Sequence, residues 1–145
     1  MKNIGMLMVL VVIMAVLSVN SRSQSLARVQ DVKATPAYKS LILKRVSLRG
    51  ELFRQREMFT SQHPDVERSN YELSLLNKEI ERMLASPSSQ ISKLSTVYAD
   101  LILRKIDLQA EEYQLRRQVT ASHPNLRQKQ IEIAALQEEI EDLLR

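Results

Sequence analysis

Histidine is the residue type in this sequence that most readily supports metal binding or acid–base catalysis near neutral pH, and it occurs twice, as His63 and His123. A metal site would need further His, Cys or carboxylate ligands at fixed spacings, and a general base would need a catalytic partner. Neither histidine has such neighbours in the sequence. Cysteine is absent, as are a glycine-rich phosphate loop, a nucleophile motif and an HExxH pair. The sequence therefore predicts no enzyme, no cofactor, no metal site and no small-molecule substrate.

Both histidines lie in a short motif that occurs twice, 60 positions apart. The candidate turn residues are Thr60, His63, Pro64 and Asp65 in the first copy and Thr120, His123, Pro124 and Asn125 in the second. Proline disfavours helical ψ at the residue before it and fits well at the first position of a helix. We therefore interpret each histidine as the residue that ends a turn and caps the helix after it.

The duplication extends well beyond the two turns. Residues 38–84 align with residues 98–144 without a gap, and 16 of the 47 aligned positions are identical. A fixed offset of this kind indicates a repeated supersecondary unit. Each turn lies between two segments with helical periodicity, so we predict two helical hairpins, over residues 36–85 and 94–145. Residues 86–93, which contain proline and several serines, are the predicted linker.

The composition predicts an all-α protein, because Gly is rare, Trp is absent and strong helix formers dominate. Apolar residues recur at alternating steps of three and four, the heptad pattern of coiled coils. In the first hairpin the expected inward residues are Tyr38, Leu41, Arg45, Leu48, Leu52, Gln55 and Phe59, widened by Ile42, Val46 and Phe53, and then Val66, Ser69, Leu73, Leu76, Ile80 and Met83. In the second they are Tyr98, Leu101, Lys105, Leu108, Glu112, Leu115, Val119, Leu126, Lys129, Ile133, Leu136, Ile140 and Leu143.

Two arrangements of the hairpins fit this pattern. They either pack side by side as an up-down-up-down four-helix bundle or stack end to end as a rod. We favour side-by-side packing, because a single two-helix hairpin buries little apolar surface. The same apolar stripes also allow self-association or binding of a protein partner, and the sequence leaves the oligomeric state open.

The N-terminus has the pattern of an export signal. A short basic segment precedes an uncharged apolar run over residues 4–17, which is about as long as the apolar part of a secretory signal. We predict a signal peptide over residues 1–23, cleaved near residues 21–25, followed by a flexible linker over residues 24–35. The alternative is an uncleaved inner-membrane anchor over residues 4–19, and the basic residues after it also leave a reversed, cytoplasmic orientation open. The expected location is the periplasm or cell envelope.

The charge distribution favours a solvated helical surface. The formal net charge is +4, but acidic and basic residues alternate along the helices. A nucleic-acid-binding protein would more often present one basic face, so we predict no nucleic-acid partner and expect membrane contact only through the N-terminal segment. In the first hairpin the ascending helix is basic and the descending helix is mostly acidic, which favours their pairing.

The first turn resembles a segment of a known family. The stretch from Phe59 to Val66, with an aromatic residue, Thr60 and a His-Pro pair before a heptad helix, resembles the coiled-coil segments of exopolysaccharide chain-length determinants, the polysaccharide copolymerases. The second turn is similar, with Val119 replacing the aromatic residue. The resemblance covers the hairpins only and therefore implies neither transport nor kinase activity.

Two functions follow from these observations. The first is a non-enzymatic exported envelope protein that acts as a coiled-coil structural or protein-interaction module, associated with exopolysaccharide or export machinery as the resemblance implies. The alternative is a periplasmic helical chaperone or an envelope-stress or metal sensor, similar in size and layout to the LTxxQ-motif family. The Leu-Thr-x-x-Gln signature of that family is missing at both turns.

Overall fold

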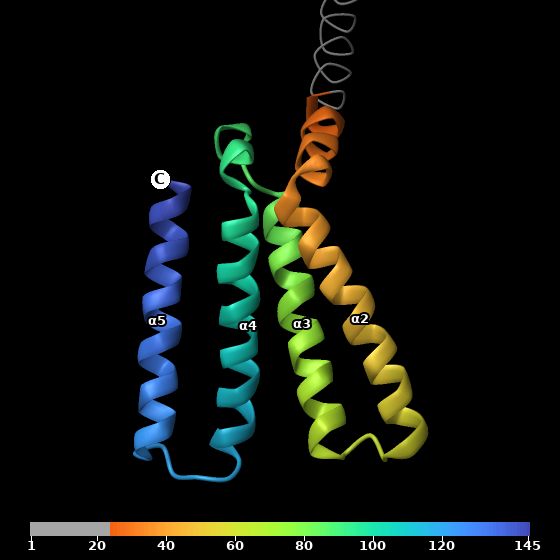
Figure 1. The fold of residues 1–145 in the computed structure, drawn as a ribbon, viewed down its shortest axis with the longest axis vertical. Helices are drawn as coiled ribbons and strands as arrows, with labels where there is room; N and C mark the ends of the chain where they lie inside the picture. The colour runs from red at the N-terminus through yellow and green to blue at the C-terminus, as the bar shows by residue number, and fades with distance from the viewer. Residues whose placement is uncertain (1–23) are drawn as a thin grey trace, which may run out of the picture.

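The computed structural model describes residues 24–145, which form helices and no strand (Figure 1). The predictions of a signal peptide over residues 1–23 and of an anchor over residues 4–19 lie outside these residues. The long helices are α2 (Pro36–Met58), α3 (Pro64–Leu84), α4 (Thr96–Arg116) and α5 (Pro124–Leu144), and a short 3-10 helix, η1 (Ser88–Lys93), joins α3 to α4. The all-α prediction, with two antiparallel helical hairpins, is confirmed.

Local sequence signals explain where the two ascending helices begin. The Thr35 hydroxyl accepts a hydrogen bond from the Tyr38 N–H at 3.2 Å, with Pro36 at the first helical position. The Ser95 hydroxyl accepts one from the Tyr98 N–H at 3.3 Å. Each cap satisfies a backbone donor that has no partner within its own helix.

The segment predicted as a flexible linker, residues 24–35, is largely helical in the structure. Residues 24–34 are helical, and Val32 is fully buried in the main core cluster. The Thr35 hydroxyl donates to the Val32 carbonyl at 2.7 Å and closes this helix directly before α2. Val32 therefore links this largely polar segment to the core. Within the predicted linker of residues 86–93, most residues belong to η1.

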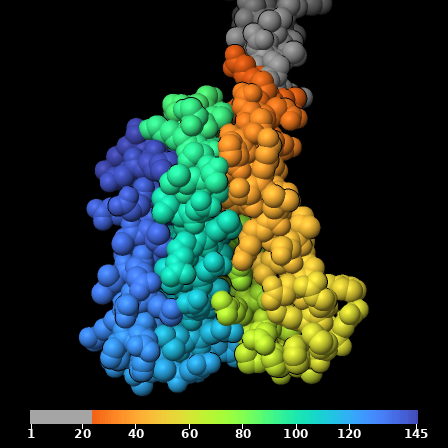
Figure 2. Space-filling model, in the orientation of Figure 1, coloured from red at the N-terminus to blue at the C-terminus, as the bar shows by residue number. Residues whose placement is uncertain are grey.

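The four long helices lie side by side in the order α2, α3, α4, α5 (Figure 1). Helix α2 contacts both α3 and α4. In the space-filling view, α2 and α4 meet in front of α3 (Figure 2). Helix α5 packs on α4 and touches η1. Side-by-side packing of the hairpins is thus observed, but α5 lies at one edge of the array instead of closing a ring of four helices.

The core is concentrated at the end of the molecule away from the two His-Pro turns. Its buried residues are Val32, Ala37, Leu41, Leu76, Ile80, Met83, Leu94, Tyr98, Ala99, Ile102, Ile106 and Ile140. Six of these twelve come from the predicted stripes, namely Leu41, Leu76, Ile80, Met83, Tyr98 and Ile140. In α4 the core also includes Ala99, Ile102 and Ile106, which the predicted stripe left out. Three stripe residues of the first hairpin are exposed instead: Val46 at 63%, Phe53 at 65% and Phe59 at 40%. The expectation that these three side chains face inward is wrong, because α2 is an outer helix with neighbours on one side.

Candidate interaction surface

The two His-Pro turns have the geometry that the capping interpretation predicts. The Nδ1 of His63 accepts a hydrogen bond from the Asp65 N–H at 3.3 Å, and the Nδ1 of His123 accepts one from the Asn125 N–H at the same distance. In both turns the threonine carbonyl accepts the histidine N–H at 3.0 Å, Thr60 in one and Thr120 in the other. Pro64 and Pro124 then open α3 and α5.

The turns differ in the side chain that packs on the histidine. The rings of Phe59 and His63 stack with centroids 4.1 Å apart, whereas the second turn has Val119 at the corresponding position. Within residues 24–145, no group of three His, Cys, Asp or Glu residues is placed to hold a metal ion. Both imidazoles therefore act on backbone N–H groups, which is a structural role.

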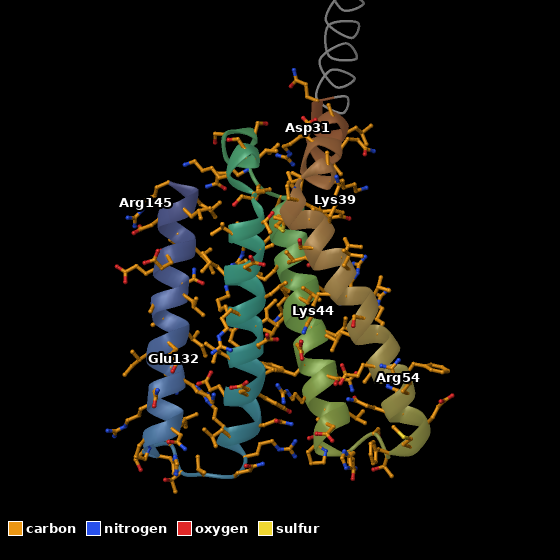
Figure 3. The ribbon with its side chains drawn as sticks, viewed as in Figure 1. Asp31, Lys39, Lys44, Arg54, Glu132 and Arg145 are labelled. Carbon is orange, nitrogen blue, oxygen red and sulfur yellow. The ribbon has the colours of Figure 1, made fainter. Side chains whose placement is uncertain are left out.

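A polar cleft of about 440 Å³ lies between the hairpins. Lys44 of α2 reaches into it, with its Nζ 2.9 Å from Glu72 of α3 and 3.6 Å from Asp107 of α4 (Figure 3). Burial lowers the pKa of Lys44, but the hydrogen bond and attraction to Glu72 and Asp107 raise it above its ordinary value. The Lys129 hydrogen bond lowers the pKa of Glu111. These carboxylates sit beside cations, so the cleft holds ion pairs.

A buried ion pair joins the second hairpin to the first. The Nζ of Lys105 in α4 lies 2.9 Å from Glu79 of α3 and 3.1 Å from the side-chain carbonyl of Gln137 in α5. Arg82 also contacts Glu79, at 3.2 Å. Burial, followed by the Glu79 charge, raises the pKa of neighbouring Tyr98 to about 12. The sequence placed Lys105 on an inward stripe but gave no indication of this partner on the other hairpin.

Near the turns the hairpins meet through two further pairs. Tyr71 of α3 and Tyr113 of α4 stack with ring centroids 4.4 Å apart. Arg117, directly after α4, forms an ion pair with Glu67 of α3. The α4 face that carries Lys105, Tyr113 and Arg117 is therefore the surface by which the second hairpin binds the first.

Among residues 24–145, a row of exposed apolar side chains without a packing partner lies on α2. Leu43, Val46, Gly50 and Phe53, which we call the outer stripe, follow one another at steps of three, four and three residues and so share one face of the helix. Leu43 is 71% exposed, and Val46 and Phe53 are exposed to a similar extent. A Cβ at Gly50 would meet no atom within 4 Å. A heptad-spaced apolar face of this kind is suited to packing against another helix.

The sequence of α2 contains a signal for this surface. In α2 the inward stripe and two of the residues expected to widen it, Val46 and Phe53, belong to two different heptad registers, whereas the third, Ile42, packs against the core. One register carries Leu41, Leu48 and Leu52, and the other carries the outer stripe. Two registers on one helix indicate two packing faces, of which this chain covers one.

Comparison with protein-family models, with curated proteins and with solved structures finds no match. Within residues 24–145, no helix combines the length and the hydropathy that a membrane crossing needs.

Proposed function

We propose that this protein is a non-enzymatic exported protein of the cell envelope that serves as a helical protein-interaction module. The observation that carries the proposal is the outer stripe of α2, where large apolar side chains at heptad spacing are exposed. The occupant that fits this face is a helix with a complementary apolar stripe. The N-terminal pattern supports export, and the resemblance of the first turn to exopolysaccharide chain-length determinants supports an association with exopolysaccharide or export machinery.

The outer stripe is tested by site-specific photocrosslinking in intact cells. A photoreactive amino acid at position 53 should give a discrete adduct, identifiable by mass spectrometry. The matched control carries the same probe at Ser74, an exposed position of α3 outside the stripe. Absence of a product specific to position 53 would contradict the interaction module. Fractionation and N-terminal sequencing of the mature protein test export separately, since a wholly cytoplasmic protein would contradict that part.

A periplasmic chaperone is the second candidate. It is favoured by exposed basic residues on the helix that carries the outer stripe, with Arg49 one helical turn before Phe53 and Arg54 directly after it in the sequence. A chaperone should suppress aggregation of an unfolding client at stoichiometric concentration, and Phe53→Gln should abolish this activity. An interaction module with a specific partner should show no such suppression.

A further inference from the structure

The outer stripe of α2 has a buried counterpart in the second repeat. At the offset of 60 residues, Val46 corresponds to Ile106, which is 1% exposed, and Gly50 corresponds to Ala110, which is fully buried. Phe53 corresponds to Tyr113, which stacks on Tyr71. The face that α4 buries against the first hairpin is therefore the face that α2 leaves open.

The surface that would receive this face of α2 is also present in the chain, and it is exposed. In the chain, α3 receives α4; its repeat equivalent is α5, which lies at the far edge of the array (Figure 1). Tyr71 of α3 corresponds to Ile131 of α5, which is 70% exposed. Placing α2 of one copy on α5 of another would bring Phe53 against Ile131, just as Tyr113 meets Tyr71 within one chain.

The charges match in the same register. The pair Lys105 and Glu79 corresponds to Arg45 and Glu139, again a cation and an anion. Arg45 is half-buried and Glu139 is exposed. An ion pair between these two residues of neighbouring copies would reproduce the contact of Lys105 with Glu79.

A second charged pair supports the register more strongly, because both of its charges have the opposite sign at the equivalent positions of the repeat. Arg117 and Glu67 correspond to Glu57 and Arg127, so the cation and the anion have exchanged places and remain complementary. Glu57 and Arg127 are both exposed. The cleft pair formed by Lys44 and Asp107 is not reproduced, since its equivalents are Arg104 and Ser47.

From these correspondences we infer that copies of this chain associate head to tail, with α2 of one copy packed on α5 of the next in the geometry by which the two hairpins pack within one chain. This inference rests on the proposed function and names its partner, a second copy. Each copy uses two different surfaces, so the contact is heterologous and extends into a ring or a fibre. The apolar stripe provides the burial, and the two charged pairs fix the register.

The absence of native cysteine allows a direct test by disulfide crosslinking. Two differently tagged full chains, one with Phe53→Cys and one with Ile131→Cys, are mixed in a mild detergent and oxidised. The inference predicts a mixed disulfide several-fold more abundant than in the control mixture of Phe53→Cys with Ser74→Cys. A Phe53→Cys product linked mainly to itself would show symmetric pairing of α2 with α2 and would overturn the head-to-tail arrangement.

Charge reversal tests the register. The mean mass, followed by light scattering over a concentration series, should rise for the unaltered chain. Glu57→Arg should weaken association by about tenfold or more, because two cations then face each other, and adding Arg127→Glu should restore it. The control Glu81→Arg makes the same change of charge at an exposed site on α3 and should have no such effect.

A monomer at all concentrations, without a mixed disulfide, would overturn the inference. The proposed function has a separate readout: a photocrosslink from position 53 to a different protein would sustain the interaction module while the head-to-tail inference fails. Absence of both crosslinks would contradict both.

Discussion

At the scale of single residues, the two histidines have a structural role that depends on one hydrogen-bond acceptor, the Nδ1 atom of the ring. His63 and His123 each hold the first turn of a descending helix through Nδ1. The side chain of the residue that donates this hydrogen bond has little influence on it. The donor is the backbone N–H of Asp65 in one turn and of Asn125 in the other, and the two hydrogen bonds have the same length. Other acceptors at this position should therefore work as well as histidine.

Removing the caps should lower stability without changing the fold. His63→Ala and His123→Ala should each reduce the free energy of unfolding by about 0.5–1 kcal/mol, the lower part of the range for N-caps, because both hydrogen bonds are long at 3.3 Å. Urea unfolding followed by circular dichroism measures this. His63→Asn keeps an acceptor and should stay close to the unaltered protein. Unchanged stability in both alanine variants would contradict the capping account.

Tyr98 should make the protein sensitive to alkaline pH. Its pKa is about 12 in the folded chain and 10.0 ordinarily, so the folded state retains the phenol proton at pH values where the unfolded state loses it. Stability from this residue is therefore complete below pH 10 and declines as pH rises toward 12, by about 2–3 kcal/mol at most. Lys44, whose pKa is also raised, adds to the decline.

The contribution of Tyr98 is isolated by comparison with Tyr98→Phe. Unfolding free energies measured between pH 9 and pH 12 should fall less steeply for the phenylalanine variant, which has no proton to lose. Two parallel curves would show that Tyr98 does not contribute to the alkaline sensitivity.

At the scale of the helices, the two copies of the repeat have equivalent faces in opposite environments. The face of α4 that contains Ala110 is buried against the first hairpin, whereas the face of α2 that contains Gly50 is open. The same hydrophobic pattern thus gives an interior in one copy and a surface in the other. Substitutions at these two equivalent positions should therefore have different effects.

Gly50→Ala should stabilise the protein. An alanine methyl group would meet no neighbouring atom, and alanine is favoured over glycine inside a helix by about 0.5–1 kcal/mol. The reverse change at the equivalent position, Ala110→Gly, removes a buried methyl group as well and should destabilise by about 1.5–2 kcal/mol. Thermal unfolding at low protein concentration measures both. Destabilisation by Gly50→Ala would show that this face is already covered.

At the scale of the whole molecule, the hairpins are held together by one apolar cluster and by charged pairs between α3 and α4. The pair of Lys105 and Glu79 is the most buried of these, with side-chain exposures of 5% and 9%. The free energy needed to remove both charges from water offsets much of the attraction within such a pair, so the pair adds little net stability. Removing only one partner, however, leaves an uncompensated buried charge, which is strongly destabilising.

Lys105→Met should therefore lower the free energy of unfolding by about 3 kcal/mol, the lower end of the usual range because Arg82 still contacts Glu79. Lys105→Met combined with Glu79→Met should recover most of the loss. Lys129→Met, at a partly exposed pair with Glu111, should cost less than about 1 kcal/mol. Denaturant unfolding of all three variants provides the measurement, and equal losses for the two single variants would contradict the assigned burial.

The sequence by itself determined the all-α class, the two hairpins and their turns. These features depend on local signals, namely Thr35 before Pro36, the two His-Pro pairs and apolar periodicity, which act within a few residues. Only the tertiary structure decided which heptad register is buried, since α2 carries two and both look equally apolar. It also placed Val32 of the helical residues 24–34 in the core and paired Lys105 with Glu79. Those outcomes depend on residues far apart in the chain, and local periodicity carries no information about which helix lies on which face.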